Sequence, residues 1–565
     1  MVVNYVISYR LEICDFLIGE IQMSKVAHYL QEHLVGEVMT STDARRYFAT
    51  DGSILQVAPS LIVYPRNEND VRKTARFSWQ LAERGRVIPV TARGSGTDQS
   101  GAALGSGIIL VFPAHMNRVL ELDMKSSTVT IEPGINFGKL QQTLYSHGRF
   151  LPPYPPSIEY STVGGAIANN DSGEKSVKYG SMRDYVASLR VVLANGEVIE
   201  TRRLSKRELS KKLGLATFEG EIYRQIDTLL EEQNELVKQL VRDVSNNNAG
   251  YSLTDIKQKD GSFDLTPLFV GSQGTLGIIT EAIVNTEPYS TQTNLMMAQF
   301  DSLEHVQSAI IELRDMSEPP SAIELIDDNT LKQVHELNPN QLKDILSPPF
   351  PAVTLLVEFD NQDRHLKKIL KKAGKILDKY AVEHQSTVDA DQQQLFWKLR
   401  QSVSSVIGNN KGLIIPIPLV DASVPIERLR EYIEGVYAIS QAGNIKPGLW
   451  GHAGDGSLKL QPNLNIGQVG DRQKAFRFLD EYHKLVIGLG GTISSTSGDG
   501  RLRTPYLEKM YGVEQYALFQ KIKNVFDPYG TLNPGVKFGT SVDDLKEMVR
   551  SDFGHDHIYD HLPRS

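Results

Sequence analysis

Short apolar runs alternate with amphipathic segments between residues 59 and 281, and this pattern predicts strands and helices in turn. Asn136 is placed to cap a helix, because its side chain can accept a hydrogen bond from a free N–H group of the first turn. Residues 206–240 are charged and helical in pattern, so we expect them to face solvent. Strands are predicted at residues 61–64, 87–91, 107–111 and 128–131, and helices at residues 70–84 and 136–147.

A β-hairpin is predicted where residues 185–193 and 198–201 flank Ala194-Asn195-Gly196. The Asn-Gly pair suits a type I′ turn, in which both central residues have positive φ.

After Pro288 the pattern changes to longer helical segments separated by strand-like runs, which predicts a second α/β unit with helices covering a sheet. Helices are predicted at residues 303–316, 364–380, 395–407, 427–441 and 472–489, and strands at residues 353–359, 413–420 and 458–460.

At 565 residues the chain is too long for one compact core, because domains usually hold about 100–200 residues. Its 40% hydrophobic and 23% charged residues are those of an ordinary globular protein. The net charge of −8 provides no basic surface, so we expect no nucleic-acid partner.

Cys14 is the only cysteine, which excludes disulfides within the chain, cysteine-based zinc sites and iron–sulfur clusters. An organic cofactor must therefore carry the electrons of any redox reaction. No apolar run approaches the roughly 18 residues of a membrane span, and charged residues interrupt any signal-peptide core in residues 1–22. Because Met23 is an alternative start, those residues carry little weight. We expect a cytoplasmic protein, with peripheral association with the inner face of the membrane as an alternative.

A glycine-rich motif, Arg93-Gly94-Ser95-Gly96-Thr97, follows a predicted strand. Glycines let the backbone approach a pyrophosphate, and successive N–H groups can bind an anion. Because the full Gly-x-Gly-x-x-Gly motif and a following helix are missing, this motif alone is more typical of an ordinary turn.

Two further segments strengthen the case for a cofactor. A stiff proline-rich run at residues 152–157 precedes a glycine-rich loop at residues 161–173, and residues 271–281 run from a glycine-rich turn into a β-branched strand. A proline-stiffened wall beside a Gly-Gly turn offers a flat apolar surface and close backbone approach. These features suit a ring system joined to a diphosphate.

In order and spacing, these segments resemble the flavin-binding domain of the vanillyl-alcohol oxidase superfamily. Within it, the chain looks most like the branch that holds glycolate oxidase, D-lactate dehydrogenase and D-2-hydroxyglutarate dehydrogenase. The resemblance covers about residues 40–540. The shared stretches are residues 93–97, 130–134, 152–157, 162–170, 178–180, 274–281 and 526–535.

The resemblance implies an α+β fold. A two-subdomain FAD-binding domain of the PCMH type would precede a ferredoxin-like α/β cap, and a C-terminal segment would return to the FAD-binding domain. The expected divisions are an N-terminal extension and helix at residues 1–45, the FAD-binding domain at 46–286, the substrate-binding cap at 287–500, the returning segment at 501–540 and a charged tail at 541–565.

The resemblance also implies how FAD is held. Residues 93–98 would surround the diphosphate, residues 162–170 would contact the flavin, Ile279 would reach the adenosine and Asn533 would lie near the isoalloxazine. Some relatives bind flavin covalently through a histidine or cysteine of the first loop, but residues 93–101 contain neither, so we expect non-covalent FAD. The expected FAD-binding residues are Arg93, Gly94, Ser95, Gly96, Thr97, Asp98, Pro153, Ser157, Thr162, Val163, Gly164, Gly165, Asn169, Asn170, Gly274, Ile279 and Asn533.

In the cap, residues 450–459 resemble the family loop His-x-Gly-Asp-Gly-Asn-Leu-His, and residues 490–500 resemble Gly-Gly-x-Ile-Ser-x-Glu-His-Gly. In the family these loops imply dehydrogenation of a 2-hydroxy acid. A divalent metal binds the hydroxyl and carboxylate, a base removes the hydroxyl proton, and a hydride passes from the α-carbon to flavin N5. Two histidines and the glutamate are the expected metal ligands, and the following histidine is the expected base.

This sequence departs from that pattern. Only His452 remains of the first histidine pair, Lys459 takes the second position, and Thr496 and Ser497 stand where the glutamate and the base are expected. One imidazole beside an ammonium and hydroxyls cannot hold a transition metal tightly, so we predict no metal of the family type.

The residues that remain are still candidates for catalysis. His452 could act as the base, and Lys459 could replace the positive charge of the metal. The alternative is that His452 and Asp455 only brace a glycine-rich turn and that Lys459 is a solvated surface charge. A charged cluster beside them adds Asp499 to the catalytic candidates; its members are Asp455, Asp499, Arg501 and Arg503.

Arg400 is a candidate for binding the substrate carboxylate. Residues 396–400 resemble the family helix in which an arginine has this role, and arginine suits it through bidentate geometry. Gln401 replaces the glutamate that usually follows, and a core helix with a surface arginine would show the same pattern.

We therefore expect an FAD-dependent dehydrogenase of a small 2-hydroxy acid resembling D-lactate, glycolate or D-2-hydroxyglutarate. Because the chain has no iron–sulfur cysteines, a separate acceptor such as an iron–sulfur protein, a cytochrome or a quinone would receive the electrons. Oxygen is an alternative acceptor. The lost metal ligands leave two alternatives. One is a metal-independent oxidoreductase of a polyol or sugar, and the other is a non-catalytic flavin-binding subunit of a complex.

Overall fold

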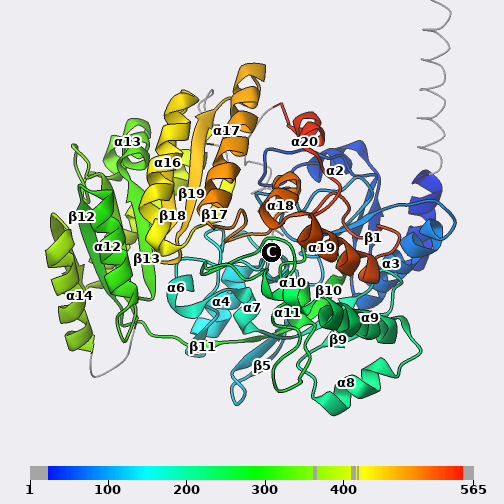
Figure 1. The fold of residues 1–565 in the computed structure, drawn as a ribbon. Helices are drawn as coiled ribbons and strands as arrows, with labels where there is room; N and C mark the ends of the chain where they lie inside the picture. Colours follow the sequence, from blue (N-terminus) through cyan, green and yellow to red (C-terminus); the bar gives the residue numbers. More distant parts are fainter. Residues whose placement is uncertain (1–22, 361–365, 409–414, 417–418, 552–565) are drawn as a thin grey trace, which may run out of the picture.

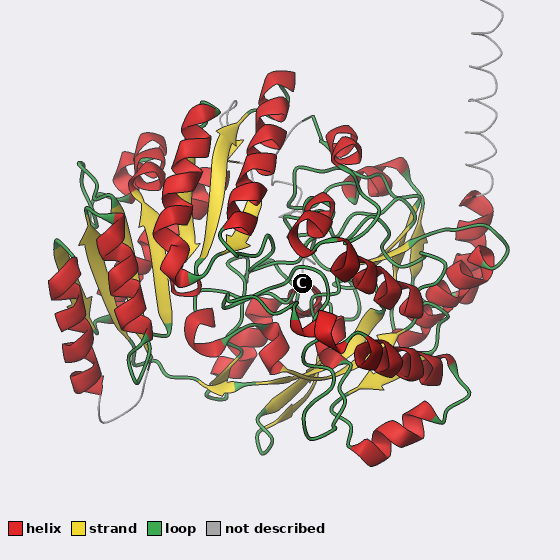
Figure 2. Cartoon of the chain, viewed as in Figure 1, coloured by secondary structure: helices red, strands yellow, loops and turns green. Residues whose placement is uncertain are grey.

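The computed structural model describes residues 23–360, 366–408, 415–416 and 419–551. Two small sheets and a two-stranded sheet of β7 (Arg149–Phe150) and β11 (Glu287–Pro288) lie in one part of the molecule, and one large sheet lies beside them (Figures 1 and 2). The expectations for residues 1–22, for part of the strand at 413–420 and for the end of the tail lie outside the described residues. Among the described helices, none combines the length and apolar character that crossing a membrane requires.

The first sheet is mainly parallel, in the order β1-β2-β4-β3. Helix α3 (Glu68–Ala82) provides the crossover that parallel strands need, and its buried residues share a core with β2 and β4. The strand predicted at residues 87–91 begins later, at Val90, because Pro89 has no N–H group to pair. The strands are β1 (Glu37–Met39), β2 (Leu61–Tyr64), β3 (Val90–Arg93) and β4 (Ile108–Val111).

The second sheet is antiparallel, in the order β5-β6-β10-β8-β9. Helix α4 (Phe137–Tyr145) begins as predicted, because Asn136 accepts a hydrogen bond from the Lys139 N–H at 3.0 Å. The strands are β5 (Val119–Asp123), β6 (Thr128–Ile131), β8 (Val186–Val192), β9 (Val198–Thr201) and β10 (Ile278–Asn285).

The predicted hairpin forms between β8 and β9, but the predicted type I′ turn is wrong. Of the Asn195-Gly196 pair, only Gly196 has positive φ, at +83°. The Gly196 N–H donates to the Leu193 carbonyl at 2.9 Å, and the Leu193 N–H donates to the Glu197 carbonyl at 2.8 Å. These bonds close a three-residue loop with glycine in the left-handed position, which is the next most common hairpin connection.

The charged segment predicted to be helical at residues 206–240 forms three helices, α8 (Lys206–Leu213), α9 (Phe218–Glu232) and α10 (Asn234–Lys238). The expectation that it faces solvent fails for α9. One side of α9 buries an apolar stripe at helical spacing, made of Ile222, Tyr223, Ile226 and Leu230.

The large sheet has the order β15-β12-β14-β13-β18-β19-β16, with β17 also paired to β19, and all its pairs are antiparallel. Alternate residues of β12 pack into different cores, so helices cover both faces. Helices α12, α14, α16 and α17 lie along one face (Figure 1), and α13 and α15 pack together over the other. The strands are β12 (Asn294–Phe300), β13 (Ala322–Asp327), β14 (Val353–Phe359), β15 (Glu383–Thr387), β16 (Ile415–Pro416), β17 (Val420–Ser423), β18 (Pro447–His452) and β19 (Ser457–Leu464). The helices are α12 (Leu303–Arg314), α13 (Asp328–Leu337), α14 (Leu366–Tyr380), α15 (Ala390–Gly408), α16 (Leu429–Ala442) and α17 (Val469–Gly488).

After α17 the chain returns to the first sheet. Helices α18 (Thr504–Tyr511) and α19 (Val513–Phe526) lead to a short stretch beside β3, and α19 packs against α9. There the Val90 N–H donates to the Thr531 carbonyl at 2.7 Å, and the Asn533 N–H donates to the Val90 carbonyl at 3.0 Å. The edge of β3 is thereby paired with a distant part of the sequence.

Candidate functional site

A cleft lies between the first two sheets and is walled by three glycine-rich segments. The loop after β3 forms one wall, and helix α5 (Val163–Asn169) with the residues before it forms another. The third wall is the turn at Gln273 and Gly274 that leads into β10. The three segments that the sequence singled out separately are therefore brought together around one cavity.

Two glycines of the first loop have no room for a side chain. A Cβ on Gly94 would lie 2.2 Å from Thr162 Oγ1, and a Cβ on Gly96 would lie 2.2 Å from Arg93 Nη2. Gly96 also has a φ of +76°, which other residues rarely adopt. The loop therefore presents bare backbone to the cleft, as close approach to a diphosphate requires.

The Arg93 side chain turns away from the cleft toward the segment before β2. Its Nη2 donates to the Thr50 carbonyl at 2.8 Å and its Nη1 to the Phe48 carbonyl at 3.3 Å, and the guanidinium lies over the Phe48 ring. Burial lowers the pKa of Arg93 to about 10. The guanidinium therefore anchors the loop, while other atoms of the residue line the cavity.

The segment expected as a loop at residues 161–173 contains a helix. Thr162 caps α5 by accepting a hydrogen bond from the Gly165 N–H at 3.2 Å, so Gly164 and Gly165 lie in the first helical turn and not in a Gly-Gly turn. The Gly164 N–H donates to the Pro133 carbonyl at 2.8 Å, which draws this turn against the second sheet. Close backbone approach is thus achieved within a helix.

Most of the expected FAD-binding residues line the cleft. Those that do are Arg93, Gly94, Ser95, Gly96, Thr97, Asp98, Thr162, Gly164, Gly165, Asn169, Gly274 and Ile279. Those that do not are Pro153, Ser157, Val163, Asn170 and Asn533. Asn533 supports the walls, because its Nδ2 donates to the Ala102 and Gln273 carbonyls at 2.9 and 2.8 Å.

The expected FAD-binding residues omit several polar residues of the cleft, among them Asp171 and Gln273. Gln273 Nε2 donates to Asn169 Oδ1 at 2.9 Å, which joins two of the walls. Burial raises the pKa of Asp171 well above its usual range, and the charge of Lys459 opposes this shift. Both residues lie inside the glycine-rich segments, so their position in the motif was the available signal.

The candidate catalytic residues gather on one face of the large sheet. The strand register places Glu324 opposite His452, and Trp450 opposite Lys459, which in turn lies opposite Asp421. Directly opposed side chains point to the same face, so Trp450, Lys459 and Asp421 form a row across β18, β19 and β17, and Glu324 and His452 form the next row across β13 and β18. The two rows bring together residues up to 135 positions apart, from Glu324 to Lys459.

Two cations lie over the ring of Trp450. Arg400 of α15 places its guanidinium carbon 4.1 Å from the centre of the Trp450 ring, and Lys459 Nζ lies 5.6 Å from the same centre. Burial lowers the pKa of Lys459, while the carboxylates of Asp421 and Asp171 oppose the shift. Lys459 is therefore a partly buried charge that adjoins the cleft, not a solvated one.

His452 and Arg400 share one buried carboxylate. His452 Nδ1 and Arg400 Nε each lie 2.5 Å from a different oxygen of Glu324, whose side chain is fully buried. Burial would raise the pKa of Glu324, but His452 and Arg400 outweigh it and lower the pKa to about 2. Glu324 was not a candidate, because a single acidic residue in an apolar strand gives no sequence signal.

The positions of the family metal ligands hold a different network. Asp421 accepts hydrogen bonds from the Thr496 and Ser497 N–H groups at 3.2 and 2.8 Å and from the Ser497 hydroxyl at 2.8 Å. Within residues 23–551, as far as they are described, no group of three or more His, Cys, Asp or Glu side chains is arranged to hold a metal ion. The residues present therefore do not fit the family metal, and its absence from the working protein stays a prediction.

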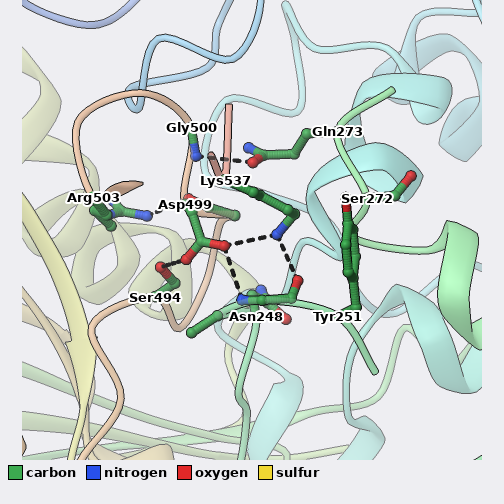
Figure 3. Close-up of polar contacts among 12 residues, drawn as sticks. Asn248, Tyr251, Ser272, Gln273, Ser494, Asp499, Gly500, Arg503 and Lys537 are labelled. Carbon is green, nitrogen blue, oxygen red and sulfur yellow. Dashed lines mark hydrogen bonds and ion pairs between the residues drawn. The ribbon is translucent and has the colours of Figure 1, made fainter. Parts of the chain in front are cut away.

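Two acidic candidates serve as braces. Asp499 accepts hydrogen bonds from Ser494 Oγ at 2.5 Å and Lys537 Nζ at 2.7 Å (Figure 3). It also accepts a hydrogen bond from Gly250 N–H at 2.9 Å, and it does not line the cleft. Asp455 accepts a hydrogen bond from the Ser176 hydroxyl. Arg501 and Arg503 of the same charged cluster donate to backbone carbonyls, Arg501 to Pro534 and Leu104, and Arg503 to Gly498.

Two family models match the chain. One, described as an FAD binding domain, matches residues 59–202, and the other, described as the C-terminal domain of FAD linked oxidases, matches residues 290–536. Together they cover more than half of the sequence.

Similar curated proteins include three kinds of enzyme. The chain is 30% identical over 540 residues to D-2-hydroxyglutarate dehydrogenase of Escherichia coli, covering 92% of this chain and 52% of that protein. It is 29% identical to glycolate oxidase subunit GlcD of Bacillus subtilis, covering 86% and 90% of the two chains, and 28% identical to D-lactate dehydrogenase of Archaeoglobus fulgidus, covering 88% and 96%. The chain spans about half the length of the D-2-hydroxyglutarate dehydrogenases that it matches.

Solved structures share the fold. The structure of p-cresol methylhydroxylase with substrate bound matches with a TM-score of 0.67 at 15% identity, covering 93% of this chain and 98% of that one. The 4-ethylphenol oxidase of Gulosibacter chungangensis matches with a TM-score of 0.67 at 14% identity, covering 92% and 98%. The predicted fold class and the resemblance drawn from the sequence motifs are both confirmed.

Proposed function

Because the chain belongs to the FAD-linked oxidases, we propose that it is an FAD-dependent dehydrogenase of a small 2-hydroxy acid resembling D-lactate, glycolate or D-2-hydroxyglutarate. One observation carries the proposal. The cations of Arg400 and Lys459 lie over the Trp450 ring, and the charge of Lys459 acts on Asp171 in the wall of the cleft. An anionic substrate would therefore find positive charge at the border of the cofactor cavity.

FAD fits the residues of the cleft and would be bound without a covalent link. The bare backbone at Gly94 and Gly96 would hold the diphosphate, and the first turn of α5 would face the flavin side. The residues that line the cleft include no histidine or cysteine. When bound, FAD would supply the acceptor for a hydride from the substrate α-carbon.

Side chains of the cap would bind the substrate, accept its hydroxyl proton and stabilise the resulting charge. The Nη atoms of Arg400 would bind the substrate carboxylate, because Nε is already used by Glu324. His452 Nε2 would accept the hydroxyl proton, and Lys459 would stabilise the negative charge that develops on that oxygen. Thr496 and Ser497 cannot replace a glutamate and a histidine as metal ligands, so no step depends on a metal.

We also propose the expected domain divisions, with the FAD-binding domain at residues 46–286, the cap at 287–500 and the returning segment at 501–540. The electrons would leave for a separate acceptor, an iron–sulfur protein, a cytochrome or a quinone.

A second candidate is a metal-independent oxidoreductase of a polyol or sugar. Hydroxyl groups at Thr496 and Ser497 beside the Asp421 carboxylate would suit a substrate rich in hydroxyls, and Thr496 Oγ1 is buried with no hydrogen-bond partner in the described part of the chain.

An anaerobic flavin-bleaching screen on metal-stripped protein loaded with FAD tests these proposals. The panel would hold both enantiomers of lactate and 2-hydroxyglutarate, glycolate, xylitol and sorbitol. We expect at least one hydroxy acid to bleach the flavin. Bleaching by polyols alone would favour the second candidate, and no bleaching at all would favour a non-catalytic flavin-binding subunit. Failure to retain FAD would overturn every version of the proposal.

A further inference from the structure

We infer that Glu324 is a positioning residue that fixes both the tautomer of His452 and the orientation of the Arg400 guanidinium. The inference deepens the proposed function and rests on it for the roles of those two side chains. The juxtaposition itself comes from the fold, since Glu324 lies on β13, His452 on β18 and Arg400 on α15.

The sheet and one helix bring the three groups into contact. Glu324 and His452 are direct partners in the β13–β18 register, so their side chains leave the sheet on one face. Helix α15 covers this face, because its Phe396 and Leu399 pack with Ile326 of β13. Arg400 follows Leu399 directly and reaches the same carboxylate from above the sheet.

Each oxygen of Glu324 has its own cationic or polar partner. Oε1 lies 2.5 Å from His452 Nδ1 and Oε2 lies 2.5 Å from Arg400 Nε. The Glu324 side chain has no exposed surface, and those of Arg400 and His452 are 8% and 3% exposed. A buried carboxylate is very costly unless it is paired, so both contacts are needed to keep it charged.

A charged carboxylate can only accept hydrogen bonds, so His452 must carry its proton on Nδ1. In the neutral ring Nε2 then keeps its lone pair, which is the form that a general base requires. His452 Nε2 is buried and has no hydrogen-bond partner among the described residues. The Glu324 contact therefore leaves the one nitrogen able to take a substrate proton unoccupied.

The same carboxylate fixes the arginine. With Nε held by Glu324 and the guanidinium carbon 4.1 Å from the centre of the Trp450 ring, the two Nη atoms are the part of the fork left for a ligand, and neither donates to a described residue. An arginine that binds a carboxylate through two hydrogen bonds loses affinity if its guanidinium plane can rotate freely. Glu324 thus keeps the carboxylate-binding edge and the proton-accepting nitrogen in one fixed relation.

The main test replaces Glu324 by Gln, which keeps the shape of the side chain and removes its charge. Asp327→Asn is the matched control. Asp327 is also fully buried on β13, but it accepts its hydrogen bonds from Thr330 N–H, Leu449 N–H and the Tyr437 hydroxyl. Both variants would be loaded with FAD, stripped of metals and checked for FAD content and thermal unfolding midpoint.

Two readouts follow. Oxalate has two carboxylates and no oxidisable C–H bond, so its Kd, measured from the change in the flavin spectrum, reports carboxylate binding by Arg400. The rate of anaerobic flavin reduction by the best hydroxy acid reports proton acceptance by His452. For Glu324→Gln we expect oxalate to bind about tenfold more weakly and flavin reduction to slow about 100-fold, while Asp327→Asn stays within about twofold of wild type on both.

The possible results separate the inference from the proposed function. If wild type neither binds oxalate nor is reduced by any hydroxy acid, the proposed function fails. If wild type does both and a folded Glu324→Gln matches it, the inference is overturned. A third measurement needs no Glu324 variant, namely the tautomer of His452 in wild-type protein labelled with ¹⁵N-histidine, assigned by comparison with His452→Gln. Nδ1–H is expected, and Nε2–H would overturn the inference even if Glu324→Gln does not fold.

Discussion

Lys537 and Asp499 form an ion pair that is completely withdrawn from solvent, with 2.7 Å between Lys537 Nζ and Asp499 Oδ2. Both members also bond to Gly250, Lys537 to its carbonyl at 2.7 Å and Asp499 to its N–H at 2.9 Å. These contacts therefore hold together three separate segments of the chain, at Gly250, Asp499 and Lys537. Because a buried charge is costly without its partner, the pair is a sensitive place to test the fold.

Replacing Lys537 by Met should lower the free energy of unfolding by about 3–5 kcal/mol, because Asp499 would be left buried and unpaired. Urea unfolding followed by circular dichroism measures the change. Lys238→Met is the control, since the Lys238–Glu235 pair is largely exposed and should cost less than about 1 kcal/mol. Equal losses in the two variants would contradict the buried-pair account.

Gly96→Ala should sharply reduce FAD binding, because a Cβ at this positive φ would press on Arg93 Nη2 and displace the loop. Titration of the apoprotein with FAD measures the effect, and we expect affinity to fall by about tenfold or more. Gly85→Ala is matched in backbone strain, with a φ of +80°, but its Cβ would meet nothing within 4 Å. It should lose about 1–2 kcal/mol of stability and keep its FAD affinity. A shared loss of FAD would indicate general strain.

Lys459→Met should weaken substrate use, because methionine can still pack on Trp450 but carries no charge for the substrate. We expect kcat/KM for flavin reduction to fall about 10- to 100-fold, while Lys446→Met, at an exposed position just before β18, should have no effect. Zinc or manganese added to metal-stripped wild type should leave the rate unchanged. Activation by either metal would show that the site binds a cation despite Lys459.

Asp51 should make stability fall as the pH rises. Burial first, and then the charge of Asp98, raise the pKa of Asp51 to about 7 from the ordinary 3.8. The folded protein therefore holds a proton that the unfolded chain releases, so stability from this group is complete below pH 3.8 and is lost as the pH rises to about 7. Thermal unfolding of the apoprotein across this range measures the slope.

Asp51→Asn should flatten that slope and be more stable than wild type above pH 7, by at most about 4 kcal/mol. Asparagine can still accept the hydrogen bonds that Ser53 donates to Oδ1. The control, Asp43→Asn, changes an exposed carboxylate and should keep the wild-type slope. An unchanged slope in Asp51→Asn would place the titrating group elsewhere.

The sequence predicted those structural features that depend on interactions between neighbouring residues. The strand at residues 128–131, the Asn136 cap and the hairpin across Gly196 all follow from neighbouring residues, and all appear in the structure. The glycine-rich segments around the cleft were likewise found, because close backbone approach leaves a compositional trace.

Relationships set by strand register could not be found this way. Nothing near Glu324 in the sequence indicates that β13 pairs with β18, which places it opposite His452, 128 residues away. The direction of the Arg93 side chain also depends on the distant carbonyls of Phe48 and Thr50. Such contacts form only when the sheet assembles, so they are properties of the fold and not of the motif.

The pairing of β3 with Thr531 and Leu532 has a consequence for biosynthesis. Val90 emerges from the ribosome about 440 residues before Thr531, which corresponds to roughly 20–90 s at typical rates of synthesis. During that interval the strand that leads into the Arg93–Gly96 loop has an open edge. Nascent chains would therefore be most exposed to edge-to-edge association before residue 531 is made, and a chaperone or early FAD binding would matter most then.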